Sequence, residues 1–333
     1  MKLIQVGVGG FGRSWVDIVG DSADWELARL VDISEGALAA ARQASGLPEQ
    51  ACFGELGPAL AAVESDAVLI VVPPEAHAPL TIEALEAGKH VLTEKPLADT
   101  LPNAQAMVDA AERAGRKLMV SQNYRFRSQA RTISDLIRRR ELGELGYVGI
   151  SFHKAPRFEG SYRLKMEHPL LVDMSIHHFD LIRCLTGLDP IRISAHSWRP
   201  QWSWFDHQPA LAVTIKMQQD VVVSYFASWV SKACETSWDA DWRLQCADGV
   251  VLWSQGEIHR AREGEEPALV GPINMPVADR GYALVEFARA IREDDQPETS
   301  GADNMKSFAM VLAAVEAIEA GREVAIADLP AHG

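Results

Sequence analysis

A short segment near the middle of the chain carries an acid and a base at helical spacing. Asp173 and His177 are four residues apart, so on a helix they share one face. A histidine titrates near neutral pH and can act as a general base toward a hydroxyl group. The same spacing also suits a surface pair or a metal. No HExxH motif or third clustered ligand accompanies it, and we therefore expect no metal site.

Two neighbouring polar residues have plainer interpretations. The helix expected here spans residues 170–185 and ends at Gly187. On a regular helix Asp180 falls on the same face as Asp173 and His177, where it either supports the site or is simply solvated. His178 points toward the apolar side of that helix, and we expect it to be a packed core histidine.

A lysine elsewhere in the sequence suits the same chemistry. Glu94, Lys95 and Pro96 follow a predicted strand at residues 90–93. A lysine at the carboxyl edge of a sheet can hold a substrate hydroxyl and stabilise negative charge on its oxygen. For an isolated tripeptide of this kind, a solvated loop lysine is the simpler interpretation.

The N-terminus contains a glycine motif typical of dinucleotide sites. Gly7, Gly9 and Gly12 have GxGxxG spacing, in a segment that also holds Gly10 and Phe11. Such glycines permit a tight turn, close approach of the backbone to a pyrophosphate and close packing of helix on strand. The helix that follows offers unpaired N–H groups to the phosphates. Alone, the motif equally fits a structural turn.

The residues around the motif favour a nicotinamide cofactor. Asp32 ends the second predicted strand, twenty residues after Gly12. A carboxylate there can accept both hydroxyls of the adenosine ribose and repel a 2′-phosphate, so we expect NAD in preference to NADP. The alternative for Asp32 is a helix cap or turn residue. Pro73 and His77 follow an apolar strand and are candidates to line the nicotinamide half, although His77 fits a helix start equally well.

The hydrophobic pattern predicts the elements that hold these residues. Strands are expected at residues 3–7, 27–32, 66–72, 90–93 and 117–121, and helices at 11–20, 35–44, 79–87 and 102–114. Apolar strands that alternate with helices indicate a doubly wound parallel sheet. Beyond residue 121 strand-like segments dominate between 190 and 254, with helices near 128–140, 170–185, 282–292 and 304–320. We therefore predict an α/β protein with domains at 1–121 and 122–333, the second built on an antiparallel or mixed sheet with helices on one face.

Bulk properties exclude several classes of protein. The chain has 333 residues, a formal net charge of −14, 47% hydrophobic and 23% charged residues. This charge repels nucleic acid and anionic membranes, so we expect neither as a partner. The sequence contains four scattered cysteines, no apolar leader and no long apolar span. We therefore expect a cytoplasmic protein without disulfides.

The order of the motifs resembles one known family. GVGGFG, Asp32, VVPPEAH, AGKHVLTEKPLA, SQNYRF and DMSIHHFDLIRCLTG follow one another as in the glucose–fructose oxidoreductase, inositol dehydrogenase and MocA family. The resemblance implies an N-terminal Rossmann domain and a C-terminal domain with a large, open, mostly antiparallel sheet used in oligomer contacts. A homodimer or homotetramer is thus implied, with the last helix available to pack back on the N-terminal domain. Ser175 replaces the family's usual glycine.

The resemblance also implies an activity and a set of site residues. Lys95, Asp173 and His177 match the family's catalytic motifs, which implies an NAD-dependent dehydrogenase acting on a CH–OH group of a sugar, sugar acid or cyclitol. Further cofactor contacts are implied at Glu94 and Asn123. Two other functions stay open: an NAD-dependent glycoside-cleaving enzyme of similar fold, and a non-catalytic regulator that senses NAD or a sugar.

A basic loop precedes the acid–base segment. Residues 153–168 contain four cations, Lys154, Arg157, Arg163 and Lys165. Arg157, Arg163 and, from the SQNYRF motif, Tyr124 are candidates for substrate contacts. A solvated loop that pairs with Glu159 and Glu167 is the simpler interpretation of the cations. Trp202 and Trp204 can stack on a sugar ring, although core or interface packing explains them equally.

Overall fold

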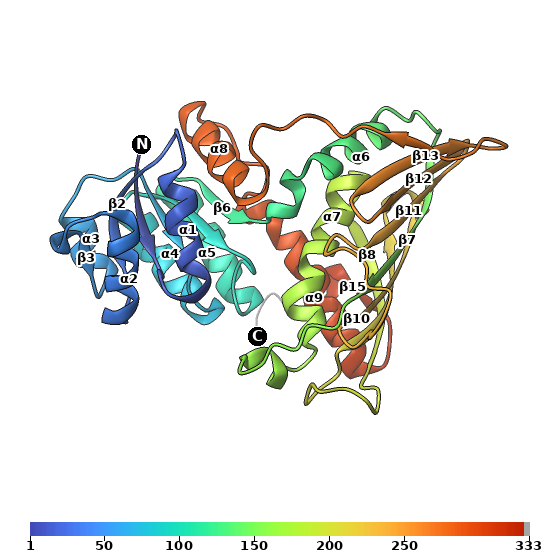
Figure 1. The fold of residues 1–333 in the computed structure, drawn as a ribbon, viewed down its shortest axis with the longest axis horizontal. Coiled ribbons are helices and arrows are strands. Elements are labelled where there is room, and N and C mark those ends of the chain that lie inside the picture. The colour runs from blue at the N-terminus through green and yellow to red at the C-terminus, as the bar shows by residue number, and fades with distance from the viewer. Residues whose placement is uncertain (330–333) are drawn as a thin grey trace. The chain divides into compact units, whose positions relative to one another are not determined.

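The computed structural model describes residues 1–329, and its contacts divide the chain into two units. Unit 1 comprises Met1–Phe126 and Val277–Met305, and unit 2 comprises Arg127–Pro276 and residues 306–329. Each unit is described by itself, with the elements labelled as in Figure 1. The domain boundary after residue 121 stays a prediction, and the contacts group residues 277–305 with the N-terminal part of the chain.

A six-stranded parallel sheet forms the centre of unit 1. Its strand order is β3-β2-β1-β4-β5-β6. The strands are β1 (Lys2–Val6), β2 (Glu26–Val31), β3 (Cys52–Phe53), β4 (Ala67–Ile70), β5 (His90–Glu94) and β6 (Leu118–Ser121). From β1 the chain adds β2 and β3 on one side of the sheet and then β4, β5 and β6 on the other. The strand order therefore reverses between β1 and β4, and the carboxyl ends of these two strands form a topological switch point, where doubly wound sheets bind ligands. The predicted doubly wound fold is confirmed.

Helices connect these strands, and their ends follow local sequence signals. They are α1 (Gly10–Gly20), α2 (Glu35–Ser45), α3 (Leu56–Ala61), α4 (His77–Glu86), α5 (Leu101–Ala114) and α8 (Asp279–Arg292), with 3₁₀ turns at Glu49–Ala51, Pro74–Ala76 and Asn123–Phe126. The Ser34 hydroxyl accepts a hydrogen bond from the Ala37 amide and caps α2. Gly46 and Gly115 end α2 and α5 in the left-handed conformation.

Helix α8 belongs to the core of unit 1 although it lies far along the sequence. The rings of Trp25 and Phe287 stack at 5.4 Å between centroids. The Trp25 indole N–H donates to the Leu284 carbonyl at 2.9 Å. Both aromatic residues belong to a buried cluster that also contains Leu3 and Trp15. Residues near 280 are thereby held beside α1 within this unit.

A nine-stranded mixed sheet forms unit 2. Its order is β14-β13-β12-β11-β7-β10-β9-β8-β15, and β7 and β10 pair in parallel while the other neighbours are antiparallel. The strands are β7 (Leu145–His153), β8 (Pro190–Trp198), β9 (Ala210–Met217), β10 (Val222–Ser228), β11 (Asp241–Cys246), β12 (Gly249–Ser254), β13 (Glu257–Arg262), β14 (Ala268–Val270) and β15 (Val324–Ala325). Burial alternates along β9 and β10, as expected when one face of a sheet is covered. The prediction of a large, mostly antiparallel sheet is confirmed.

Helices pack on one side of this sheet (Figure 1). They are α6 (Ser128–Arg138), α7 (Ile176–Thr186) and the later part of α9 (Gly301–Ala320), with 3₁₀ turns at Tyr162–Lys165, Gln218–Asp220 and Ile326–Asp328. The segment Leu170–Ser175 before α7 is π-helical. The single regular helix predicted for residues 170–185 is therefore wrong in its first part.

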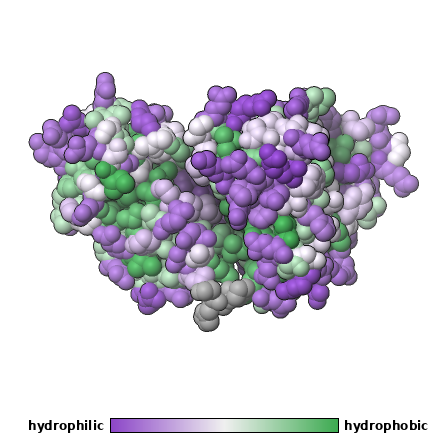
Figure 2. All heavy atoms as spheres, turned by 90° about the horizontal axis from the view of Figure 1, so that it is seen from below, coloured by the Kyte–Doolittle hydropathy of each residue, from purple (hydrophilic) through white to green (hydrophobic). Residues whose placement is uncertain are grey.

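Hydrophilic and hydrophobic side chains both occur on the surface. Figure 2 shows hydrophilic and hydrophobic residues interspersed on the face that it draws. Within residues 1–329, no helix combines the length and the apolar character needed to cross a membrane.

Candidate functional site

The turn after β1 leaves no room for side chains at two of its glycines. Gly7 has φ of 83°, and a Cβ there would lie 2.0 Å from the Val71 carbonyl oxygen. A Cβ on Gly12 would lie 2.2 Å from the Gly7 carbonyl oxygen. The buried side-chain amide of Gln5 donates to the Gly7 and Gly12 carbonyls at 3.0 and 2.7 Å. The turn is therefore held close to the sheet, with the N-terminus of α1 directly after it.

Asp32 fixes the same turn from the end of β2. Its Oδ2 accepts hydrogen bonds from the Val8 and Gly9 amides at 2.8 and 3.2 Å, and its Oδ1 accepts from the Ser34 amide at 2.8 Å. A carboxylate offers about four acceptor positions, so these three bonds leave capacity for a ligand hydroxyl. Asp32 thus acts as a turn residue, and the predicted ribose contact is compatible with that role.

These residues fit a dinucleotide. Gly9 has φ of −86°, and a Cβ there would have its nearest neighbour, the Ala37 Cβ, at 3.4 Å. Gly9 thus has room for a Cβ, whereas a side chain on Gly7 or Gly12 would fill the space inside the turn. A pyrophosphate would be held by the backbone N–H groups at the start of α1, near Gly10 and Phe11, and the adenosine ribose by Asp32.

Sequence reasoning missed a cation beside this helix. The Arg280 guanidinium lies 4.7 Å from the centre of the exposed Phe11 ring and 5.4 Å from that of Trp15. It donates to the Ser14 hydroxyl at 2.7 Å. Burial lowers its pKa, and the negative charge of Glu94 opposes that shift. A guanidinium at the first turn of a helix adds to its attraction for an anion. No spacing in the sequence links residue 280 to residues 11–15.

Glu94 and Lys95 lie at the carboxyl end of β5, as predicted. Glu94 is buried, and its carboxylate accepts hydrogen bonds from the Trp15 indole at 2.9 Å and from the Lys95 amide at 3.0 Å. Burial raises the pKa of Glu94, while the positive charge of Lys95 and the bond from Trp15 oppose the rise. The half-buried Lys95 precedes a cis peptide bond to Pro96. Glu94 thus anchors the backbone from which the lysine projects.

His77 also contacts the segment that follows β5. It begins α4 and is buried, with Nδ1 at 2.9 Å from the Pro96 carbonyl and Nε2 at 2.9 Å from the Val72 carbonyl. Burial lowers its pKa. The ring therefore connects the end of β4, next to the exposed Pro73, with the segment after Lys95. The predicted cofactor contacts of His77 and Pro73 stay predictions.

The next predicted residues follow β6. Asn123 donates from Nδ2 to the Asp279 carboxylate at 3.2 Å. Tyr124 is buried in the same 3₁₀ turn. Asn123 is thus held next to the residue that precedes Arg280. Its cofactor contact and the substrate contact of Tyr124 stay predictions.

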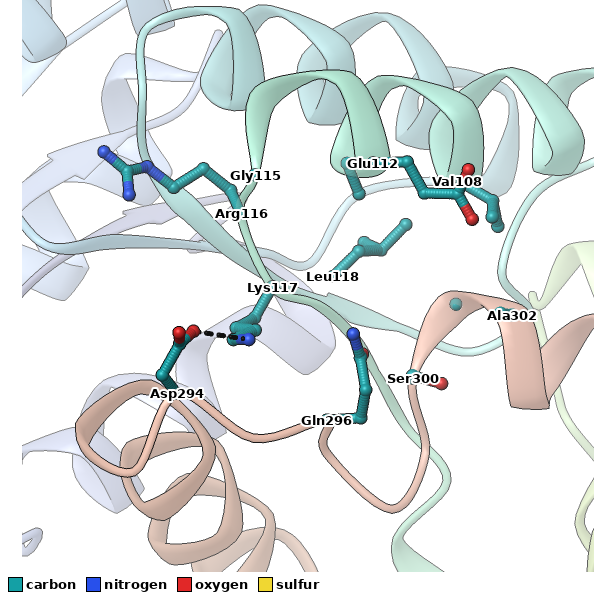
Figure 3. A pocket seen from close by; sticks show the side chains of 12 residues that line it. Val108, Glu112, Gly115, Arg116, Lys117, Leu118, Asp294, Gln296, Ser300 and Ala302 are labelled. Atoms are coloured by element: carbon teal, nitrogen blue, oxygen red, sulfur yellow. Dashed lines mark ion pairs between the residues drawn. The ribbon is translucent and has the colours of Figure 1, made fainter.

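A hollow elsewhere in unit 1 contains none of the predicted residues. It has a volume of about 520 Å³ and is lined by the end of α5, the start of β6 and residues 294–302 (Figure 3). The Lys117 ammonium, which lies in it, pairs with the Asp294 carboxylate at 2.8 Å. This hollow is not part of the candidate site.

In unit 2, Asp173 lies on the π-helical turn and is paired with a loop arginine. The Arg163 guanidinium donates to the Asp173 carboxylate at 2.6 Å from Nε and at 3.4 Å from Nη2. Burial lowers the pKa of Arg163, but the bond and the charge of Asp173 outweigh it, and the net shift is upward. Arg163 therefore pairs with a predicted catalytic residue, and not with Glu159 or Glu167 as the solvated-loop interpretation supposed.

The other polar residues of this segment are buried. His177 is 8% exposed at the start of α7, and His178 is 0% exposed, which confirms the prediction of a core histidine. Asp180 is 1% exposed and accepts a hydrogen bond from the Ser307 hydroxyl at 2.7 Å. Simple solvation is therefore the wrong interpretation of Asp180. The side chain supports α7 from within the unit.

Two further cations of the basic loop, Arg157 and Lys154, contact other groups. The Arg157 guanidinium stacks 4.0 Å from the Trp204 ring centre. The Lys154 ammonium pairs with the Glu235 carboxylate at 2.9 Å. Trp202 is 59% exposed, so core packing is the wrong interpretation of that tryptophan. The candidate substrate contact of Arg157 stays a prediction. Across residues 1–329, no three His, Cys, Asp or Glu side chains cluster as metal ligands would.

Family models match both parts of the chain. Residues 1–122 match the oxidoreductase family with an NAD-binding Rossmann fold, and residues 130–252 match the GFO/IDH/MocA C-terminal domain. The chain belongs to the GFO/IDH/MocA oxidoreductase family. As a GFO/IDH/MocA protein it is an NAD-dependent dehydrogenase, in line with the glycine turn and Asp32 described above.

Several relatives of this GFO/IDH/MocA protein match it over nearly their whole lengths. The D-apiose dehydrogenase of Paraburkholderia graminis is 28% identical over 98% of this chain and 90% of its own. The inositol 2-dehydrogenase of Rhizobium meliloti is 26% identical over 97% of this chain and 98% of its own. An oxidoreductase of Agrobacterium radiobacter, solved with NAD⁺, L-tartaric acid and magnesium, shares the fold with a TM-score of 0.90, 22% identity and coverage of 99% of both chains.

Proposed function

We propose that this enzyme transfers a hydride between NAD and a CH–OH group of a sugar, sugar acid or cyclitol. The observation that carries the proposal is the retained set of Lys95, Asp173 and His177 on a fold whose glycine turn fits a dinucleotide. The substrate class is supported by the names of the relatives, which act on D-apiose and inositol. A regulator would need no general base, so the retained histidine favours an enzyme.

Each residue of the set has a proposed role. His177 takes the proton of the substrate hydroxyl as the general base. Lys95 donates a hydrogen bond to the same oxygen and stabilises its developing negative charge. Asp173 binds a neighbouring hydroxyl, and the nicotinamide supplies the hydride acceptor. The Glu94 carboxylate, bonded to the Lys95 amide, fixes the backbone that carries the lysine.

The basic loop supports an anionic substrate as one member of this class. Arg163 uses its Nε and Nη2 groups on Asp173, so the opposite edge of the guanidinium, at Nη1, is the side that would bind a substrate carboxylate. A sugar acid would therefore meet a cation directly beside the proposed catalytic carboxylate. The relative that was solved with L-tartaric acid agrees with this preference.

We propose that copies of the chain associate through the outer face of the nine-stranded sheet. That face exposes four large hydrophobic side chains, namely Tyr147 at 48%, Trp198 at 37%, Val222 at 41% and Phe226 at 40%. The rings of Trp198 and Phe226 lie 5.5 Å apart. Large exposed apolar side chains gathered on one face of a sheet are typical of a protein interface. Light scattering of the purified protein would give the subunit number, and a monomer would contradict this proposal.

The experiment for the activity compares matched histidine variants. A panel of sugars, sugar acids, cyclitols and glycosides is incubated with NAD, and both NADH absorbance and release of sugar from the glycosides are followed. We expect His177→Asn to lower kcat on the preferred substrate by about 10²- to 10⁴-fold with unchanged NAD affinity. His207→Asn, at a half-buried loop position between β8 and β9 of the same unit, should leave kcat unchanged. Full turnover by His177→Asn would overturn the assignment of the base, and product formation without NADH would indicate the glycoside-cleaving alternative.

A further inference from the structure

Three buried polar side chains connect the segment that carries Asp173 and His177 to the sheet of unit 2. The Tyr225 hydroxyl, on β10, lies 3.1 Å from the Ser175 hydroxyl and 2.9 Å from His178 Nδ1. Ser175 and His178 are 0% exposed, and Tyr225 is 1% exposed.

The contact between His178 and the Trp238 carbonyl determines the direction of the other hydrogen bonds in this cluster. His178 Nε2 lies 3.0 Å from the backbone carbonyl of Trp238. A carbonyl only accepts, so Nε2 carries the proton of the neutral ring and Nδ1 is an acceptor. The Tyr225 hydroxyl must therefore donate to His178 Nδ1. Its oxygen is then left to accept from the Ser175 hydroxyl.

Ser175 also contacts the π-helical turn itself. Its hydroxyl lies 3.2 Å from the Leu170 carbonyl, five residues earlier. One serine proton cannot serve both acceptors fully, so it is shared between the Leu170 carbonyl and the Tyr225 oxygen. Five-residue spacing is that of a π turn, and Leu170 and Ser175 are the first and last residues of the π-helical segment. Ser175 thus links the two ends of the turn to each other and to the sheet.

The packing of Tyr225 restricts its movement. Its ring lies 5.5 Å from that of Phe179 and 5.7 Å from that of His178, both on α7. The Tyr225 hydroxyl therefore contacts the π turn from a side chain that packs against α7. Deletion of one oxygen in this cluster would remove the link while leaving most of the packing in place.

We propose that Ser175, Tyr225 and His178 are positioning residues, which hold the π-helical turn so that Asp173 and His177 keep a fixed mutual orientation. Asp173 lies within the turn, and His177 follows it by two residues, after Ser175. Relaxation of the turn to a regular helix would rotate one of the two relative to the other. This proposal rests on the proposed roles of Asp173 and His177. Ser175, which stands where the family usually has glycine, is the residue that makes the link to Tyr225 possible.

The test uses two variants that each remove one hydroxyl oxygen, and the double variant that removes both. Ser175→Ala, Tyr225→Phe and the double variant are compared with Ser228→Ala, a matched control. Ser228 is buried on the same strand as Tyr225, but its hydroxyl accepts from the Val230 amide and does not contact the turn. Folding is verified by circular dichroism and by NAD binding, and kcat, KM and the pH profile of kcat are measured.

We expect each single variant to lower kcat about ten- to a hundredfold, the range produced by small misplacement of reacting groups. NAD affinity should be unchanged, and the rising limb of the pH profile should shift. The double variant should be no slower than the slower single variant, because the two hydroxyls act as one link. Ser228→Ala should show wild-type kcat and pH profile.

Two results would overturn the proposal. Wild-type kcat and pH profile in folded Ser175→Ala and Tyr225→Phe would show that the cluster only stabilises the core. Additive losses in the double variant would show that the hydroxyls act separately. If Tyr225→Phe does not fold, kcat and the pH profile of Ser175→Ala alone decide whether the cluster only stabilises the core. Failure of the proposed function is distinguishable, since it appears as full turnover by His177→Asn whatever these variants do.

Discussion

Burial of His178 predicts a loss of stability in mild acid. Burial lowers the pKa of its imidazole from 6.5 to about 4, assisted by the positive charge of Arg127 and opposed by the bond to the Trp238 carbonyl. Because the folded-state pKa lies below the unfolded value, the unfolded chain binds more protons between these two values. The stability that the neutral ring contributes is fully present above pH 6.5 and is lost as the pH falls toward 4.

The magnitude follows from the pKa difference. The interval from 6.5 to about 4 corresponds to about 3 kcal/mol at about 1.4 kcal/mol per pKa unit. Of this, about 2 kcal/mol is lost between about pH 7 and about pH 5. Urea unfolding followed by tryptophan fluorescence at these two pH values measures the loss for the wild type, His178→Gln and the control His207→Gln, at a loop position.

We expect His178→Gln to be less stable than the wild type at neutral pH, because it disrupts the bonds to Tyr225 and Trp238. Its further loss of stability on acidification should be about 2 kcal/mol smaller than that of the wild type. His207→Gln should follow the wild type at both pH values. The same acid sensitivity in His178→Gln and the wild type would refute the reasoning.

Three further predictions concern the cofactor half. Gly12→Ala places a Cβ 2.2 Å from the Gly7 carbonyl oxygen and should abolish measurable NAD binding in calorimetry; near-native affinity would contradict the close packing of the turn. Asp32→Ser removes a carboxylate whose charged hydrogen bonds are worth about 1.5–3 kcal/mol each, and the ratio of NAD to NADP affinity should fall at least about tenfold; an unchanged ratio would exclude the ribose contact. Arg280→Met keeps the packing on Phe11 but loses the charge, so NAD affinity should fall about tenfold, the scale of one charged contact. The control Arg42→Met, which removes an exposed ion pair with Glu49 in the last turn of α2, should bind NAD normally. Equal affinities in these last two variants would remove Arg280 from the cofactor site.

Local sequence signals account for most of the fold. The glycines at 7 and 12 and the apolar run of β4 predict the parallel sheet, because each acts through short-range geometry. Capping by Ser34 and Gly46 likewise depends only on neighbouring residues. The prediction placed these elements within a few residues of their observed bounds.

The missed features depend on contacts between distant segments. The π turn arises where the Ser175 hydroxyl meets Tyr225, fifty residues later in the chain, and a periodicity argument assumes a regular helix. Arg280 approaches α1 because α8 packs through Phe287 on Trp25. The pairing of Arg163 with Asp173 depends on the path of an irregular loop. None of these contacts has a signature in residue spacing.

The proposed mechanism requires that Lys95 and His177 act on one substrate hydroxyl. A crystal structure of the enzyme with NAD and a bound polyol or sugar acid would reveal both contacts. We expect Lys95 Nζ and His177 Nε2 both to lie within hydrogen-bond reach, about 2.6–3.2 Å, of the same substrate oxygen. A substrate oxygen that contacts only one of the two side chains, or a lysine far from the imidazole in that complex, would contradict it.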